Sequence, residues 1–160
     1  MAVVKLRPSF KDYLWGGTKL KEKYQKETNL KIVAESWEIS THPDGESIID
    51  SGVHCGLTLS KYIELRGKAI LGSKAAKFEQ FPLLVKLIDA KKDLSIQVHP
   101  DDEYGLKYEN EFGKTEMWYI LEAKPNAIIY YGLNQNIDKN DYYCYLVATV
   151  RLRKGLNLTS

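Results

Sequence analysis

Cysteine is scarce in this 160-residue sequence: Cys55 and Cys144 stand alone and far apart. This spacing excludes both a disulfide framework and a zinc site built from paired Cys-x-x-Cys motifs. Long apolar runs are missing too, since no segment approaches the roughly 20 residues of a membrane span. The first residues also lack the basic and apolar regions of a signal peptide. We therefore expect a cytoplasmic protein with no membrane partner.

An excess of charge of one sign is also absent. The 23 Lys and Arg residues against 21 Asp and Glu leave a formal charge of +2, without long charged blocks. Electrostatics therefore suggests neither nucleic acid nor an anionic membrane as a partner. An uncharged small molecule or a compact anion is easier to accommodate, and the length suits a single domain.

Short strand-like segments separated by turn residues dominate what is present. One helix is predicted at 59–66, where Thr58 is a candidate N-cap and Gly67 follows, and 68–80 is helix or loop. Many short strands favour a sandwich or barrel over alternating strands and helices. The predicted fold class is therefore mainly β with a few helices. The predicted strands are 3–6, 13–15, 32–39, 48–49, 81–89, 94–99, 117–122 and 127–131.

The most informative polar pattern lies in the predicted strand 94–99. Side chains two apart share one face of a strand, so Ser95, Gln97 and His99 point the same way. Pro100 cannot donate to a sheet ladder, so the strand should end near His99. We expect the imidazole at the rim of the barrel or sandwich.

A second polar pair follows at the start of the apolar run 117–121. Lys114 and Glu116 share a face there, so a second strand can bring a carboxylate beside the first. Zinc accepts His nitrogen and carboxylate or amide oxygen, and a catalytic zinc usually keeps three protein ligands. The set Gln97, His99 and Glu116 fits, although a lone strand His is more often structural than a ligand.

Lys86 is out of place in the apolar run 83–88. Burying an unpaired charge costs several kcal/mol, so an anionic group should meet it. The partner is a structural carboxylate, such as Asp89 or Glu116, or it is a phosphate or another substrate oxygen. A snorkelling lysine is the simpler alternative.

Four motifs together resemble one enzyme family. The segment FPLLVKLIDAKKDLSIQVHPDD at 81–102 is similar to the signature region of type I mannose-6-phosphate isomerases, and GKTEMWY at 113–119 is similar to the next motif. The upstream segments YLWGG at 13–17 and ESWEIS at 35–40 resemble N-terminal landmarks of the family. The resemblance covers 6–141.

The resemblance implies a cupin-type jelly-roll β-barrel or sandwich and a zinc-dependent interconversion of mannose 6-phosphate and fructose 6-phosphate. Such an isomerisation moves a proton through an enediol and needs a Lewis acid and a base. Whether Lys86 or Lys114 is the base is left undecided. Carried over position by position, the zinc ligands would be Gln97, His99 and Glu116, and the residues lining the substrate would be Ser95, Lys86 and Lys114.

Upstream residues receive a structural interpretation. Trp15 and Trp37 are expected to pack in the core, and Gly16-Gly17 to form a turn. We assign no role to His42 or His54.

The chain departs from the family towards its end. The family pattern continues with a further His ligand and an Arg, but no His follows His99, and nothing in the spacing of Arg151 and Arg153 makes them substitutes. We therefore divide the chain into an isomerase part, 1–141, and a divergent tail, 142–160. We expect a truncated or interrupted reading frame, an incomplete fold, weak zinc binding and poor or no turnover.

Two other functions compete with the isomerase. One is a non-catalytic cupin-like fragment that binds a metal or a sugar phosphate. The other is a cupin oxygenase using iron, against which stands Gln97, because a two-His, one-carboxylate iron site would want His at that position.

Overall fold

The computed structural model describes residues 3–75, 78, 80–95, 97 and 99–129. The chain divides into two compact units, Met1–Leu94 and Ser95–Ser160. The predicted boundary between 1–141 and 142–160 lies outside the described residues, as do Cys144, Arg151 and Arg153.

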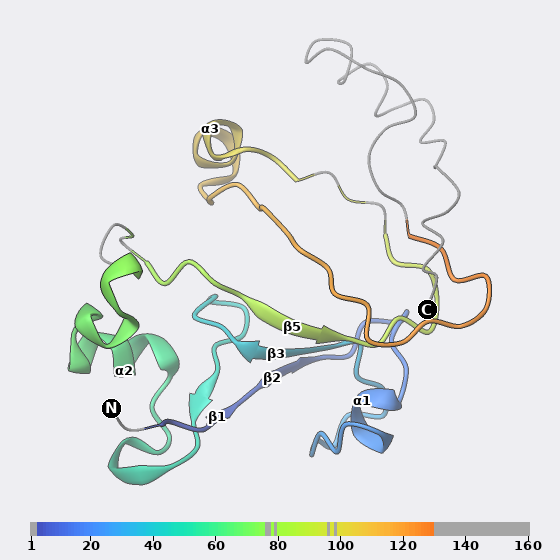
Figure 1. Ribbon diagram of the computed structural model, residues 1–160, viewed down its shortest axis with the longest axis horizontal. Helices are drawn as coiled ribbons and strands as arrows, with labels where there is room; N and C mark the ends of the chain where they lie inside the picture. Colours follow the sequence, from blue (N-terminus) through green and yellow to red (C-terminus); the bar gives the residue numbers. More distant parts are fainter. Residues whose placement is uncertain (1–2, 76–77, 79, 96, 98, 130–160) are drawn as a thin grey trace. The chain divides into compact units, whose positions relative to one another are not determined.

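A three-stranded antiparallel sheet forms the centre of the first unit (Figure 1). Its strands are β2 (Ser9–Lys11), β3 (Glu35–Ile39) and β5 (Val85–Ile88), with β3 in the middle. In this register Trp37 lies opposite Ser9 on β2 and opposite Lys86 on β5. The sheet therefore brings together segments that are far apart in the sequence.

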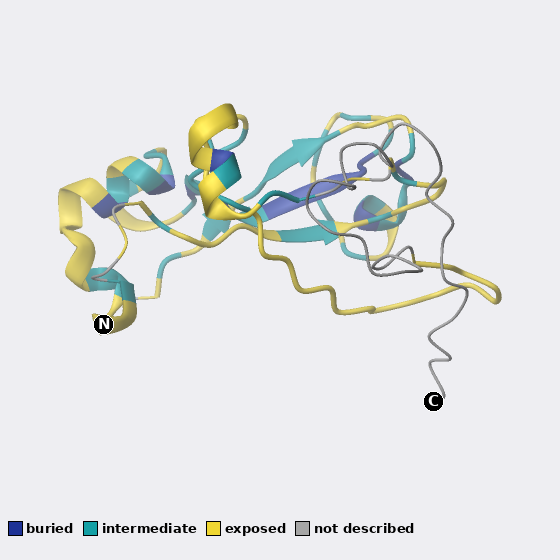
Figure 2. Ribbon diagram, turned by 90° about the horizontal axis from the view of Figure 1, so that it is seen from above, coloured by how far each residue is buried: buried dark blue, intermediate teal, exposed yellow. Residues whose placement is uncertain are grey.

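A smaller strand pair and one helix enclose the apolar core of the first unit. Strand β1 (Leu6–Arg7) pairs antiparallel with β4 (Ile48–Ile49), and helix α2 (Leu59–Arg66) packs Leu59 and Ile63 against Ile49. Leu59 and Ile63 are four positions apart, so they lie on one face of the helix. Burying each such side chain contributes about 1.5–3 kcal/mol. Figure 2 shows the buried residues along β3 and on this helix.

Helix α2 has the predicted bounds because local signals set both of its ends. The Thr58 side chain accepts a hydrogen bond from the Lys61 backbone N–H at 3.4 Å and so satisfies one otherwise unpaired donor. Gly67 follows with φ 77° and ψ 151°, a conformation that essentially only glycine adopts. The helix prediction at 59–66 is confirmed.

The remaining helical segments of the first unit are short. The open prediction of helix or loop for 68–80 has a mixed outcome: its described residues contain two short 3₁₀ segments, and 76, 77 and 79 lie outside the described part. The segments are α1 (Lys19–Glu22), η1 (Gly52–His54), η2 (Lys68–Leu71) and η3 (Ser73–Ala75).

The turn predicted at Gly16-Gly17 lies slightly earlier: it is centred on Leu14-Trp15 and closed by Gly16, while Gly16 and Gly17 form β-bridges with Ala90 and Val33. The Gly16 N–H donates to the Tyr13 carbonyl at 2.9 Å. A Cβ atom on Gly16 would lie 2.6 Å from the Cα of Ala34, so no larger residue fits against β3 there. The predicted strand 13–15 is wrong, because these residues belong to the turn.

The second unit carries a short helical coil between two extended arms. Helix α3 (Asp102–Tyr104) runs into a single π-helical turn, η4 (Gly105–Glu109). The Asp101 side chain caps this coil by accepting from the Tyr104 N–H at 2.9 Å. Most of the described side chains here are exposed (Figure 2).

The strand predictions succeed in part in the first unit, where 3–6 shares only Leu6 with β1 and 13–15 is wrong, and they fail in the second. The predictions at 32–39 and 48–49 contain β3 and β4, and the prediction at 81–89 contains β5. The described residues of 94–99, 117–122 and 127–129 form no strand, and 130–131 lie outside the described part. A strand needs a partner ladder, and none includes these residues in the portion that the structure describes.

Across the ranges covered by the structure, no helix combines the length and the apolar character that a membrane crossing requires.

Candidate active site

One face of the sheet carries a cluster of charged and aromatic side chains. Glu35 and Trp37 are two apart on β3 and share a face, and residues directly opposite them in the register share it as well. Lys11 lies opposite Glu35, and Lys86 lies opposite Trp37. The register alone therefore places two lysines, a carboxylate and an indole together.

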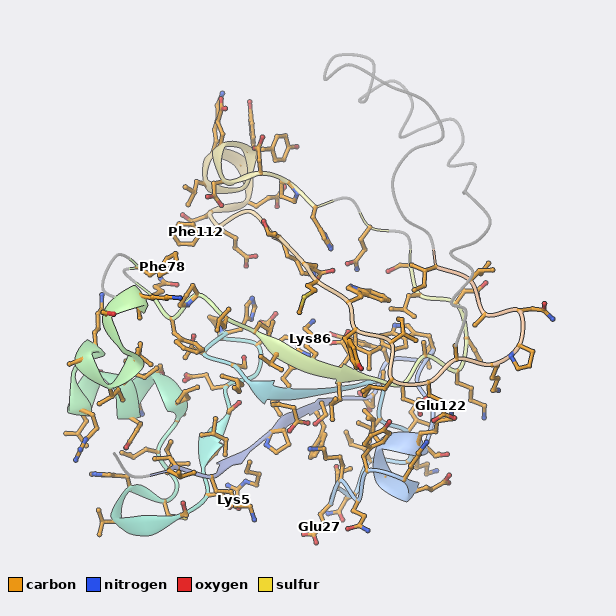
Figure 3. The ribbon with its side chains drawn as sticks, in the orientation of Figure 1. Lys5, Glu27, Phe78, Lys86, Phe112 and Glu122 are labelled. Atoms are coloured by element: carbon orange, nitrogen blue, oxygen red, sulfur yellow. The ribbon has the colours of Figure 1, made fainter. Side chains whose placement is uncertain are left out.

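Glu35 is the carboxylate that meets Lys86. The Nζ atom of Lys86 lies 3.1 Å from Oε2 of Glu35, and the Trp37 indole N–H donates to the same oxygen at 2.6 Å. The two side chains of the ion pair are 19% and 10% exposed. Because water is largely excluded, loss of either charge would leave the other unpaired and poorly solvated. The Lys86 side chain is therefore held beside a carboxylate in a defined place on β5 (Figure 3).

The Trp37 ring completes the environment of the Lys86 ammonium. Lys86 Nζ lies 4.6 Å from the ring centroid, and Lys11 Nζ lies 4.4 Å from it. Both distances suit cation–π attraction, worth about 0.5–2 kcal/mol each. Trp37 is only 5% exposed, so the prediction that it packs in the core is confirmed.

An anionic partner for Lys86 is confirmed, but neither of the two carboxylates named from the sequence supplies it. Asp89 instead accepts from the Lys19 backbone N–H at 2.8 Å. Glu116 belongs to the second unit and has its own partners there. Sequence reasoning missed Glu35, although its position two residues before Trp37 on a predicted strand was a usable signal.

Two of the three predicted metal ligands meet in the second unit. His99 Nε2 lies 3.0 Å from Oε2 of Glu116. Two donors on one tetrahedral zinc lie about 3.3 Å apart, given metal–ligand distances near 2.0 Å. The pair thus has the donor chemistry and close to the spacing of two zinc ligands.

Two further groups contact the Glu116 carboxylate. Lys114 Nζ lies 2.9 Å from Oε1, and the Trp118 indole N–H donates to Oε2 at 3.2 Å. Partial burial alone would raise the pKa of Glu116, but the hydrogen bonds from Lys114, Trp118 and His99 and the Lys114 charge outweigh it and lower the pKa to about 2. Glu116 is therefore ionised at neutral pH, as a metal ligand must be.

Gln97 and Ser95 contact each other. The Gln97 side-chain amide donates to Ser95 Oγ at 3.3 Å, which agrees with the shared face predicted for them. Both residues are exposed. Within the described ranges, no group of three or more His, Cys, Asp and Glu side chains is placed to hold a metal ion. The contacts thus join His99 with Glu116, and Ser95 with Gln97, as two separate pairs.

The family model for the catalytic domain of phosphomannose isomerase type I matches residues 3–129, most of the chain. The chain belongs to the type I phosphomannose isomerase family. The family resemblance seen in the sequence motifs is therefore confirmed. The predicted fold class, mainly β with a few helices, is confirmed with it, as part of the fold of these isomerases.

Individual relatives agree with this family. The putative mannose-6-phosphate isomerase YvyI of Bacillus subtilis is 44% identical over 128 residues, covering 79% of this chain and 40% of the relative. The probable mannose-6-phosphate isomerase GmuF of the same organism is 43% identical over 159 residues, covering 94% of this chain and 49% of the relative. A crystal structure of mannose 6-phosphate isomerase from Bacillus subtilis superposes with a TM-score of 0.73 at 40% identity, covering 79% of this chain and 40% of the crystallised chain.

The chain spans less than half the length of these relatives.

Proposed function

We propose that this chain supplies the metal-binding part of a zinc-dependent mannose-6-phosphate isomerase, which interconverts mannose 6-phosphate and fructose 6-phosphate. The observation that carries the proposal is the His99–Glu116 pair, with Nε2 and Oε2 3.0 Å apart, within the residues 3–129 that match the family model. YvyI and GmuF are named as a putative and a probable mannose-6-phosphate isomerase, and the similar crystal structure is that of a mannose 6-phosphate isomerase, which supports the substrate.

The donor set favours zinc as the metal. His nitrogen and carboxylate oxygen suit zinc, and Gln97, two residues before His99 in the sequence, would contribute an amide oxygen as the third protein ligand. Zinc, when bound, supplies a Lewis acid that polarises a sugar oxygen. Because the structure pairs Gln97 with Ser95, we expect weak metal binding until the Gln97 side chain turns.

The chain's own cations are assigned to the substrate. Lys86 and Lys114 each carry an ammonium group beside a carboxylate, Glu35 and Glu116 respectively. An ammonium group stabilises phosphate oxygens and the negative charge that develops on an enediol oxygen. Which of the two lysines is the base that moves the proton between C1 and C2 stays open, and that lysine must act as the neutral amine. Ser95 Oγ can hydrogen-bond a sugar hydroxyl.

The remaining features of the proposal rest on the sequence. A cupin-type jelly-roll closure, a cytoplasmic location and the absence of nucleic-acid partners stay predictions. A non-catalytic metal- or sugar-phosphate-binding module is the second candidate function. It is favoured by one observation, namely that only two of the three predicted ligands are in contact.

A coupled assay of isomerase activity on mannose 6-phosphate with added zinc tests this function. The variants are His99→Ala and, as the matched control, His54→Ala, whose ring packs on Tyr62 in the first unit. We expect little turnover in the wild-type chain, all of it lost in His99→Ala and retained in His54→Ala. Measurable turnover that is equal in wild type and His99→Ala would contradict the role of His99, whereas zinc binding with no turnover in wild type would favour the binding module.

A further inference from the structure

The loop 100–113 of the second unit is closed at its base by two hydrogen bonds. The Lys114 backbone N–H donates to the Pro100 carbonyl at 3.2 Å. The Gly113 backbone N–H donates to Oδ1 of Asp102 at 2.9 Å. We name these two contacts the clasp. The loop that they close holds α3 and η4 and ends beside Phe112, which is labelled in Figure 3.

Gly113 is packed tightly into the clasp. A Cβ atom at this position would lie 2.5 Å from the Asp101 carbonyl carbon and 2.5 Å from the Asp102 nitrogen. It would also lie 2.9 Å from the Pro100 oxygen. These neighbours are backbone atoms, so they cannot move aside cheaply. The close approach of the two arms therefore depends on glycine as well as on the hydrogen bonds.

The clasp stands directly behind the pair of candidate ligands. His99 is the residue before Pro100, and Glu116 is two residues after Lys114. The two backbones joined by the Lys114–Pro100 hydrogen bond are thus the backbones that carry His99 and Glu116. Without the clasp, a flexible loop of more than ten residues would separate His99 from Glu116. Bringing these two ligands together would then cost loop-closure entropy.

We propose that Asp102 is a positioning residue for the metal site, because its carboxylate closes the loop that brings His99 and Glu116 together. This inference rests on the proposed function, since it takes the pair as zinc ligands. Asp102 touches neither ligand side chain by this contact; it acts through the Gly113 backbone. Groups that hold ligands in place typically change metal affinity by about 10- to 100-fold when removed.

The test compares zinc affinity in Asp102→Ala, Asp102→Asn and Glu103→Ala. Asp102→Ala removes the acceptor of the Gly113 N–H, whereas Asp102→Asn retains an amide oxygen that can accept the same bond. Glu103→Ala is the matched control, as an exposed acidic residue next to Asp102 in the same helix. Zinc chloride is titrated into each full chain against a chromophoric chelator.

A second measurement needs no zinc. His99 Nε2 and the Trp118 indole N–H both contact Oε2 of Glu116, so their protons should give a nuclear Overhauser cross-peak in the zinc-free chain. The indole signal of Trp37 reports whether the first unit of each variant is folded, and the retained cross-peak in Asp102→Asn and Glu103→Ala controls for the second unit. Gly113→Ala opens the clasp by a different route and should behave like Asp102→Ala.

We expect Asp102→Ala to bind zinc about tenfold or more weakly and to lose the cross-peak, while Asp102→Asn and Glu103→Ala stay within about twofold of wild type. Unchanged affinity, or a retained cross-peak, in a folded Asp102→Ala chain would overturn the inference. If the wild-type chain binds no zinc, the proposed metal site is wrong. Loss of the cross-peak in Asp102→Ala would even then support the clasp, and its retention would overturn it.

Discussion

The Lys86 ammonium lies 3.1 Å from a Glu35 carboxylate oxygen that also accepts the indole N–H of Trp37. Both partners are at most one fifth exposed, and the ring of Trp37 lies beside the ammonium at 4.6 Å. The relationship explains how a lysine can stand in an apolar strand. It also holds in place the Lys86 side chain, which we propose binds the substrate.

Glu35→Gln and Lys86→Met should each destabilise the chain. Each change leaves the opposite partner with a poorly solvated, unpaired charge, so we expect a loss of about 1–3 kcal/mol in the free energy of unfolding. In the double variant both charges are absent, and the loss should be smaller than the sum of the two single losses. Urea denaturation of the four proteins measures this coupling.

Glu27→Gln is the matched control for this cycle, because Glu27 is exposed in the same unit. Its effect should stay within about 0.5 kcal/mol. Strictly additive losses from Glu35→Gln and Lys86→Met would show that the ion pair contributes nothing.

Glu116 should titrate far below an ordinary glutamate. Its pKa of about 2 lies below the ordinary value of 4.5. Since the folded-state pKa is the lower one, the stability that Glu116 contributes is fully present above about pH 4.5 and is lost as the pH falls towards 2. Carboxyl ¹³C NMR of the zinc-free chain measures the midpoint directly.

Lys114→Met should raise that midpoint, because it removes both a hydrogen bond and a neighbouring positive charge. Lys107→Met is the control: Lys107 belongs to the same unit but lies against the Tyr108 ring. A Glu116 midpoint that is the same in wild type and Lys114→Met would refute the electrostatic account of this site.

Gly67→Ala should destabilise the chain by about 1–3 kcal/mol, because φ 77° with ψ 151° is strained for any residue with a Cβ atom. No neighbour lies within 4 Å of the position of the new methyl group, so the cost is one of backbone conformation. Thermal unfolding compares it with Leu65→Ala, a 62% exposed residue on the same helix that should change stability little. Equal melting temperatures for wild type and Gly67→Ala would contradict this reading of the helix end.

The sequence predicted best what neighbouring residues decide. Helix α2 was predictable to the residue, because the cap at Thr58 and the stop at Gly67 are local signals. The contact between His99 and Glu116 was predictable as a pairing of two polar segments. The helix depends on residue types at short spacings, whereas the contact joins residues 17 positions apart and was predicted from two strands that the described residues do not form.

The features that depend on distant partners were not predictable. Glu35 meets Lys86 only because β3 pairs with β5 in one particular register. The segments 94–99 and 117–122 have strand-like patterns, but a pattern does not supply a partner strand. The orientation of Gln97 towards Ser95 likewise follows from side-chain geometry that spacing alone does not determine.

A calorimetric titration of the metal-free chain with zinc chloride tests most directly the central claim that His99 and Glu116 bind zinc. We expect one zinc per chain, affinity lost in both His99→Ala and Glu116→Gln, and affinity retained in the control His42→Ala, whose ring packs on Trp37. Zinc binding that is equally strong in wild type and His99→Ala would show that the metal is held elsewhere, and the proposed site would be wrong.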